Sequence, residues 1–303
     1  MRRAASGNGT ILLATDFSEP ARLVVPYALM LASSLNLGLT LLHVVKAPPG
    51  SEEWSPAKRR SIDSLKTSAL LELARLARHA QEKKMAVDHR LAVGVPADAI
   101  LKEAEDVDAR LIVVGTHGRT GLDRLRLGSV AETVLTKAPC PVLTGCAAGG
   151  SSAPAKASRA AVSRLLVAVD FSASSRAAFR FAVLLAKRWR AKIVMVHVAG
   201  PSGISRPKSV QSDESSRGRI ERRFERLISA CQAGQMVGDR IVLQGDDPVE
   251  AILDQAKRVN AGVLVMGTSG RRGLNLLLLG SVARSVVRKA ACPVLVVKAR
   301  SRR

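Results

Sequence analysis

The chain has 303 residues, a length typical of about two domains. Hydrophobic residues make up 47% and charged residues 24%, which excludes a disordered chain, and no apolar run is long enough to span a bilayer. The N-terminus lacks the apolar stretch of a secretory signal, and the four cysteines include no CxxC pair. We therefore expect a cytoplasmic protein with reduced thiols.

The first half of the chain alternates short apolar runs with helical patterns. Strands are predicted at 10–15, 37–45, 87–93, 110–115 and 141–143, and helices at 19–35, 57–84, 96–107 and 129–137. Within the longest helix the predicted apolar stripe consists of Leu65, Ala69, Leu73, Leu76 and Ala80. This alternation predicts an α/β fold with a doubly wound parallel sheet.

The second half repeats the first. The glycines at 115, 118, 121 and 128 recur at 267, 270, 273 and 280, and Asp16 and His43 recur as Asp170 and His197. A duplicated domain explains this order and spacing. We predict domains at 1–146 and 162–303, joined by a flexible Gly-, Ala- and Ser-rich linker at 147–161. Residues 203–219 are less regular, and we expect them to be partly disordered.

Positive charge is concentrated in the second half. The formal net charge is +22 overall; residues 1–150 contribute +4 and residues 151–303 contribute +18. Such a half can bind a polyanion, or its arginines can simply form a solvated surface. Aromatic residues are only 3%, which predicts an aliphatic core and argues against base stacking as a binding mode.

A glycine-rich segment follows the fourth predicted strand of each copy. Gly115, Gly118 and Gly128 precede Ser129, which begins a predicted helix; in the second copy these residues are Gly267, Gly270, Gly280 and Ser281. Glycines let backbone N–H groups approach a phosphate, and a helix N-terminus favours an anion. The alternative is a turn glycine followed by an ordinary N-cap serine.

Acidic and basic side chains flank this predicted phosphate loop. Asp16 and Asp170 end the first strand of each copy, where a carboxylate can bind ribose hydroxyls or a metal ion, or can cap the following helix. Arg119 and Arg271 are candidate phosphate clamps. Further arginines of the same loops are Arg124, Arg126 and Arg272.

Histidine and cysteine contribute no recognisable metal site. We interpret His43 and His197 as satisfied, half-buried side chains rather than ligands. His117 lies in the glycine loop, but Ser269 replaces it in the second copy, which argues against a shared catalytic base. Two of the four cysteines, Cys140 and Cys292, occupy matching positions before the last strand of each copy. We predict that both are buried thiols.

Two common phosphate-binding motifs are absent from the sequence. There is no GxxxxGK[ST], so no P-loop lysine is available. The glycines are spaced GxxGxxG after the fourth strand, which excludes the usual dinucleotide fingerprint after the first strand.

The repeated strings closely resemble the universal stress protein family in its tandem form. The resemblance rests on "TDFS" and "VDFS", "LLHVV" and "VHVA", "GTHGRTGLDRLRLGS" and "GTSGRRGLNLLLLGS", and two "CPVL" endings. It implies two five-stranded sheets of order 3-2-1-4-5 with an adenine-nucleotide alpha hydrolase-like fold. It also implies dimer-like packing through the final strands, either as a homodimer or as a pseudo-dimer within one chain.

The resemblance further implies an ATP site in each copy, because the signature G-2x-G-9x-G-[ST] is intact in both. Asp16 and the Val44 backbone would contact the nucleoside in the first copy, and Asp170 and Val198 would do so in the second. Phosphates, with Mg²⁺, would be held by the residues Gly115, Gly118, Gly128, Ser129, Val130, Gly267, Gly270, Gly280, Ser281 and Val282.

Three functions are compatible with these residues. The first is an ATP-binding stress-response protein that acts as a nucleotide sensor or regulator with little or no hydrolysis. The second is a slow Mg-dependent ATPase or phosphotransferase in which Asp16 or Asp170 positions the metal. The third is a basic interaction module whose second half binds nucleic acid or an acidic protein partner; no membrane partner is expected.

Overall fold

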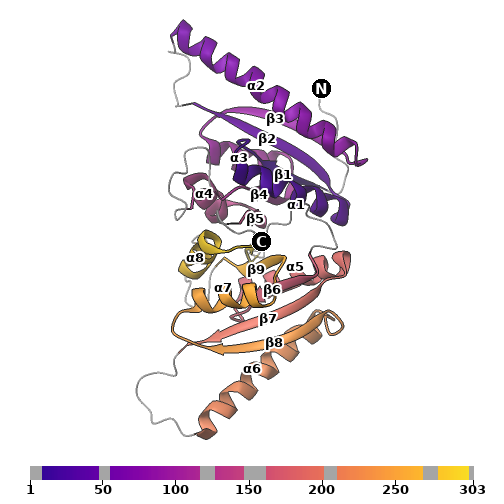
Figure 1. Cartoon of the computed structure of the whole chain (residues 1–303), viewed down its shortest axis with the longest axis vertical. Helices are drawn as coiled ribbons and strands as arrows, with labels where there is room; N and C mark the ends of the chain where they lie inside the picture. Colours follow the sequence, from indigo (N-terminus) through magenta and orange to yellow (C-terminus); the bar gives the residue numbers. More distant parts are fainter. Residues whose placement is uncertain are drawn as a thin grey trace. The chain divides into compact units, whose positions relative to one another are not determined.

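The computed structural model describes residues 9–47, 55–116, 127–146, 162–200, 210–268 and 279–299. The chain forms two compact units, drawn mainly from residues 1–148 and 159–303. Each unit is an α/β domain (Figure 1). The predicted linker at 147–161 lies outside the described residues.

The first unit is built on a five-stranded parallel sheet of order β3-β2-β1-β4-β5. Its strands are β1 (Thr10–Ala14), β2 (Gly38–Lys46), β3 (Val87–Gly94), β4 (Ala109–Val114) and β5 (Val142–Thr144). The predicted strand order is therefore confirmed. β1 is buried along its whole length, as expected for a central strand covered on both faces.

Four helices connect these strands. They are α1 (Glu19–Leu35), α2 (Pro56–Gln81), α3 (Pro96–Asp106) and α4 (Ser129–Lys137). α3 and α4 pack against each other. Since parallel crossovers are right-handed, α1 and α2 cover the opposite face of the sheet.

The second unit repeats this plan with the order β8-β7-β6-β9-β10. Its strands are β6 (Arg164–Ala168), β7 (Lys192–Ala199), β8 (Val237–Gln244), β9 (Val263–Gly267) and β10 (Val294–Val297). Its helices are α5 (Ala173–Trp189), α6 (Val210–Ala230), α7 (Pro248–Arg258) and α8 (Ser281–Lys289). Both halves thus adopt the predicted doubly wound fold.

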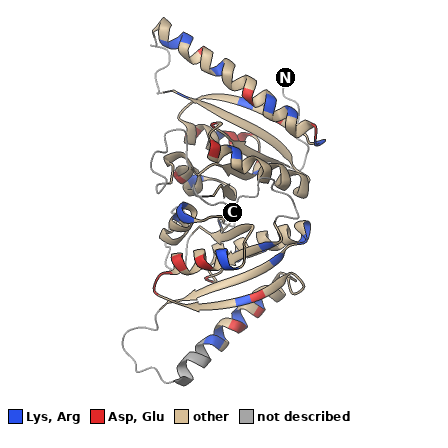
Figure 2. Ribbon diagram, viewed as in Figure 1, with Lys and Arg blue, Asp and Glu red and all other residues tan. Residues whose placement is uncertain are grey.

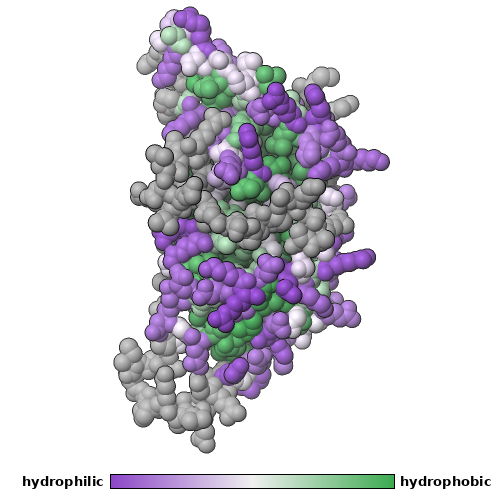
Figure 3. Space-filling model, viewed as in Figure 1, coloured by the Kyte–Doolittle hydropathy of each residue, from purple (hydrophilic) through white to green (hydrophobic). Residues whose placement is uncertain are grey.

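The core is mainly aliphatic, as the composition predicts. Leu, Val, Ile and Ala supply most buried side chains, and the few aromatic residues fill the largest buried volumes, among them Tyr27, Phe179 and Phe224. The face drawn in Figure 3 alternates hydrophilic and hydrophobic surface. None of the described helices is long and apolar enough to cross a membrane.

Two details of the sequence interpretation are wrong. Leu65 of α2 is 47% exposed, and the buried side of the helix is formed by Ile62, Ala69, Leu73, Ala77 and Ala80. Leu65 follows Ile62 by three residues, or about 60° around the helix, and so lies at the edge of the buried face. Residues 210–219, predicted to be irregular, belong to α6, which Phe224 and Leu227 anchor.

Candidate functional site

After the two central strands of each sheet, the chain continues toward opposite edges of that sheet. β1 and β4 are neighbours, but α1 leads the chain to β2 whereas α4 leads it to β5. β6 and β9 diverge in the same way. Open α/β sheets bind their ligands beyond the carboxyl ends of such strands. Each unit therefore has one candidate site.

Asp16 lies two residues beyond β1, in the loop that leads into α1. Its Oδ1 accepts hydrogen bonds from the Ser18 backbone N–H at 3.0 Å and from the Ser18 hydroxyl at 2.6 Å. Asp170 repeats the backbone contact, with Oδ1 2.9 Å from the Ser172 nitrogen. Both aspartates are half-buried. These hydrogen bonds hold the two carboxylates at the carboxyl edge of their sheets.

The serines, not the aspartates, cap the helices. The Ser18 hydroxyl accepts from the Ala21 N–H at 3.4 Å, and the Ser172 hydroxyl accepts from the Ser175 N–H at 3.2 Å. The alternative in which Asp16 and Asp170 are the N-caps is therefore wrong. Since serine does the capping, the structural need of the helix does not explain an aspartate at this position.

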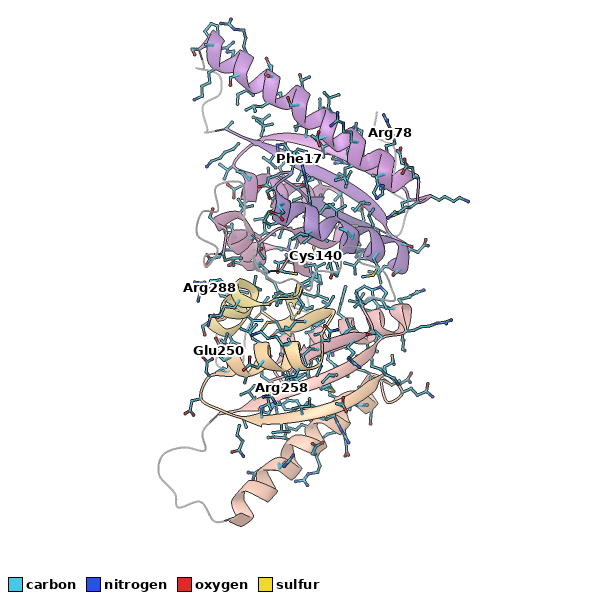
Figure 4. The ribbon with its side chains drawn as sticks, viewed as in Figure 1. Phe17, Arg78, Cys140, Glu250, Arg258 and Arg288 are labelled. Carbon is cyan, nitrogen blue, oxygen red and sulfur yellow. The ribbon has the colours of Figure 1, made fainter. Side chains whose placement is uncertain are left out.

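A phenylalanine next to each aspartate has a left-handed backbone. The φ angle is 62° at Phe17 and 64° at Phe171. A bulky residue in this region is strained, and such strain is concentrated at functional sites. Phe17 is labelled in Figure 4. The sequence contains no signal for this strain, because residues with positive φ there are usually glycine or asparagine.

A buried histidine supports each strained turn. His43 Nδ1 is 2.7 Å from the Thr15 carbonyl oxygen, and the His43 ring stacks on Phe17 with centroids 4.6 Å apart. In the second unit His197 Nδ1 is 2.6 Å from the Val169 carbonyl oxygen. The interpretation of both histidines as satisfied side chains is confirmed. No group of three metal-ligating side chains occurs within the described residues.

The backbone of Val44 faces the candidate site. The end of β1 bonds to β2 through the Thr15 N–H and the Leu42 carbonyl oxygen, 2.9 Å apart. Backbone polar groups of alternate residues in a parallel strand point to the same neighbour, so those of Val44 point past the end of β1. Val198 holds the equivalent place, two residues beyond Val196, whose carbonyl bonds to the end of β6.

The first signature glycine of each copy has a packing role. A Cβ at Gly115 would lie 3.1 Å from the Ala21 nitrogen, and one at Gly267 would lie 2.5 Å from Ser174 Oγ and 2.7 Å from the Ser175 nitrogen. Glycine therefore lets β4 and β9 approach the first turn of α1 and α5. This contact explains both glycines without a ligand.

The last signature glycine is the N-cap of the helix after the loop. Gly128 precedes α4 with φ −62°, and Gly280 precedes α8 with φ −61°. Neither provides a side-chain hydrogen bond to the first turn. Ser129 and Ser281 are the first helical residues and are exposed, so the alternative of an N-cap serine is wrong. Their successors, Val130 and Val282, are half-buried.

The remaining predicted contacts lie outside the described residues. These are Gly118, Gly270 and the arginines Arg119, Arg124, Arg126, Arg271 and Arg272. The ends of both loops are described: the Gly128 N–H donates to the Thr116 carbonyl at 2.9 Å, and the Gly280 N–H donates to the Thr268 carbonyl at 2.7 Å.

A model of the universal stress protein family matches residues 7–144 and again residues 161–298. The chain belongs to this family. It is 28% identical over 304 residues to a universal stress protein of Mycolicibacterium smegmatis, covering 96% of this chain and 97% of the relative. Universal stress protein A homolog 1 of Coxiella burnetii is 37% identical over 139 residues, covering 44% of this chain and 92% of the relative.

A solved universal stress protein from Archaeoglobus fulgidus shares the fold. Its TM-score is 0.69 at 24% identity, with 96% of this chain and 97% of that chain covered. The family and the tandem α/β architecture expected from the sequence are thereby confirmed.

The two universal stress protein units differ around the strained phenylalanine. Phe17 lies nearly parallel to His43, whereas Phe171 is tilted by 48° to His197. Phe171 also contacts Phe224 of α6, with ring centroids 5.3 Å apart, and the Arg223 guanidinium lies 4.1 Å from the Phe171 centroid. In the second unit a cation from α6 thus packs on the residue that follows Asp170, a contact that sequence reasoning missed.

Proposed function

We propose that each unit binds one adenine nucleotide and that the protein acts as an ATP-binding sensor or regulator in a stress response. The observation that carries this proposal is the repetition of one arrangement in both units. A hydrogen-bonded carboxylate, a valine backbone directed past the first strand and a helix N-terminus without a side-chain cap all follow the carboxyl ends of the central strands.

The phosphates bind at the first turns of α4 and α8. Because Gly128 supplies no side-chain cap, the amides of Ser129 and Val130 are available to an anion, and the helix dipole favours negative charge there. Gly280, Ser281 and Val282 do the same in the second unit. Gly118, Gly270, Arg119 and Arg271 complete this phosphate site in our proposal.

In the same proposal the nucleoside binds beside the loops after β1 and β6, away from the first turns of α4 and α8. Asp16 and Asp170 accept hydrogen bonds from ribose hydroxyls, since a carboxylate accepts such donors but repels a phosphate. The backbone N–H and C=O of Val44 and Val198 provide one donor and one acceptor to the adenine edge.

Magnesium enters this proposal as a companion of the phosphates. Oxygen ligands suit Mg²⁺, and nucleotide sites often hold it by one or two carboxylates together with the phosphates. In our proposal the ion is held chiefly by the phosphate oxygens. Little or no hydrolysis is expected, because His43 and His197 are buried and direct Nδ1 to a backbone carbonyl.

The test is nucleotide stoichiometry in single-site variants. Purified protein freed of nucleic acid is denatured, the released nucleotide is identified by mass spectrometry, and Mg-ATP is added back in a calorimeter. We expect about two nucleotides per wild-type chain and about one in Asp16→Asn or Asp170→Asn, since asparagine keeps the turn to serine but loses the charge. Asp63→Asn, on the exposed surface of α2, is the matched control.

The same samples are assayed for phosphate release. Binding without turnover supports a sensor, whereas turnover that either asparagine variant abolishes with binding retained supports the ATPase or phosphotransferase alternative. No released nucleotide together with no heat on adding Mg-ATP contradicts the proposal.

A further inference from the structure

Helix α6 carries a continuous row of arginines. Arg219, Arg222, Arg223 and Arg226 follow the spacing i, i+3, i+4, i+7, which places them on one side of a helix. Three of them are exposed, and Arg223 is half-buried against Phe171. The row spans about 10 Å of helix axis, from seven residues at 1.5 Å each.

Within residues 217–230 of α6, the two glutamates lie on another side of the helix from the arginine row. Glu221 and Glu225 face β8, where Arg240 approaches them at 3.6 Å and 3.5 Å. Their charge is therefore directed toward a cation of the sheet rather than toward the arginine row. Figure 2 shows Lys and Arg recurring along α6, with acidic residues between them.

Helix α5 adds a second row of cations. Arg176, Arg180 and Lys187 are exposed and share one side of the helix at i, i+4 and i+11. α5 contains no Asp or Glu at all.

One residue is contacted from both helices. Arg176 of α5 donates to the Phe171 carbonyl at 2.6 Å, and Arg223 of α6 lies over the Phe171 ring. Each row therefore contributes one cation to the surroundings of Phe171.

The equivalent helices of the first unit differ mainly in α1. α2 is itself basic, with six Lys or Arg against two acidic residues, although Lys66 pairs with Asp63 at 2.9 Å and Arg75 pairs with Glu72 at 2.8 Å. α1 has one arginine and one glutamate, whereas α5 has four basic residues and no acidic one. The cationic row of α5 is therefore a property of the second unit rather than of the shared fold.

We propose that the α5–α6 basic surface binds the phosphate backbone of duplex nucleic acid. This surface consists of Arg176, Arg180, Lys187, Arg219, Arg222, Arg223 and Arg226. Six of its seven cations are arginine, whose planar guanidinium matches the geometry of phosphate oxygens.

The lack of exposed aromatic side chains in the described part of the chain favours duplex over single-stranded nucleic acid as the ligand. No Phe, Tyr or Trp among the described residues is exposed, so single-stranded bases find no stacking platform. Duplex nucleic acid presents the densest array of phosphates and needs only cations for non-specific binding. Recognition by this surface is expected to be independent of base sequence.

The test measures binding of the full chain to a fluorescent DNA duplex of about 20 base pairs by anisotropy, between about 50 and 200 mM salt. The variant Arg219→Gln/Arg222→Gln/Arg226→Gln removes three exposed cations and spares Arg223, which packs on Phe171. The control Arg60→Gln/Arg75→Gln/Arg78→Gln removes the same charge from exposed positions of α2. Thermal unfolding of each variant verifies the fold.

We expect the α6 variant to weaken duplex binding at least about tenfold at low salt. Its slope of log K against log salt should fall by up to about 2.7, or about 0.9 for each lost phosphate contact, while the control changes little. Equal losses in both variants indicate a response to net charge and overturn the proposal, as does the absence of duplex binding. Tighter binding of fluorescent polyglutamate than of the duplex, with the same sensitivity to the α6 variant, overturns it in favour of an acidic protein partner.

Discussion

His43 and Thr15 are joined by a contact of 2.7 Å between the imidazole Nδ1 and the carbonyl oxygen, and both residues are buried. The bond connects β2 to the residue that precedes Asp16. The second unit contains the same bond between His197 and Val169. Each histidine thus positions the turn that carries the candidate nucleoside-binding carboxylate.

Replacing His43 by phenylalanine should destabilise the first unit. The aromatic ring is kept for stacking on Phe17, but the Thr15 carbonyl loses its partner, which costs about 1–3 kcal/mol for a buried group. Urea unfolding measures the loss, and nucleotide titration should show weaker binding at one site of two. His89→Phe, on the exposed part of β3, is the control; equal stability of His43→Phe and wild type would contradict a positioning role.

Alanine at the first signature glycine should destabilise the fold even without nucleotide. Gly267→Ala should cost more than Gly115→Ala, because its Cβ would approach the Ser175 backbone nitrogen to 2.7 Å whereas the nearest atom at Gly115 is 3.1 Å away. Overpacking of this kind costs about 1–3 kcal/mol. Chemical denaturation of the nucleotide-free protein gives the comparison.

Gly245→Ala is the matched control in the second unit, since a Cβ there has no neighbour within 4 Å. If Gly267→Ala is as stable as this control but fails to bind nucleotide, the glycine serves the ligand and not the packing.

Cys146 should make the stability of the protein fall at high pH. Burial raises the pKa of its thiol to about 11 from an ordinary value of 9.0. Between these two values the unfolded chain has lost the proton while the folded chain keeps it, so the free energy of unfolding decreases as pH rises. Two pKa units correspond to about 2.7 kcal/mol.

The contribution of Cys146 is isolated by comparison with Cys146→Ala. Urea midpoints of wild type and variant are measured from about pH 8 to 11, and the wild type should lose more stability over this interval. Parallel curves for the two proteins would contradict the raised pKa.

The ion pair between Lys289 and Glu250 should contribute little. Its atoms are 2.5 Å apart, but the two side chains are 42% and 51% exposed; Glu250 of α7 is labelled in Figure 4. Exposed pairs of this kind stabilise by about 0–1 kcal/mol. Glu250→Gln should therefore shift the urea midpoint only slightly, and a loss above about 2 kcal/mol would show that the pair has a larger structural role.

The fold could be predicted from the sequence because hydrophobic periodicity and the internal repeat both report it directly. Runs such as residues 11–14 and 111–114 are continuous and apolar, as buried parallel strands require. The first ten residues of α6 were predicted to be irregular because they are polar and lack apolar residues at helical spacing. Their helix continues into Phe224 and Leu227, which pack in the core.

The site could be predicted only as a set of positions. Spacing locates Asp16 and Gly115 at the ends of adjacent strands, but backbone angles and helix contacts determine what each residue does there. The left-handed Phe17, the serine caps and the contact of Gly115 with Ala21 all depend on three-dimensional packing. Sequence spacing alone contains none of these.

The bond between the Gly128 N–H and the Thr116 carbonyl joins the two ends of the first glycine loop. Because β4 and α4 are fastened to each other there, the intervening segment can be exchanged for one of another length at a modest cost in chain entropy. Gly280 and Thr268 fasten the second loop independently. The two loops can therefore change independently of each other, each on an unchanged scaffold.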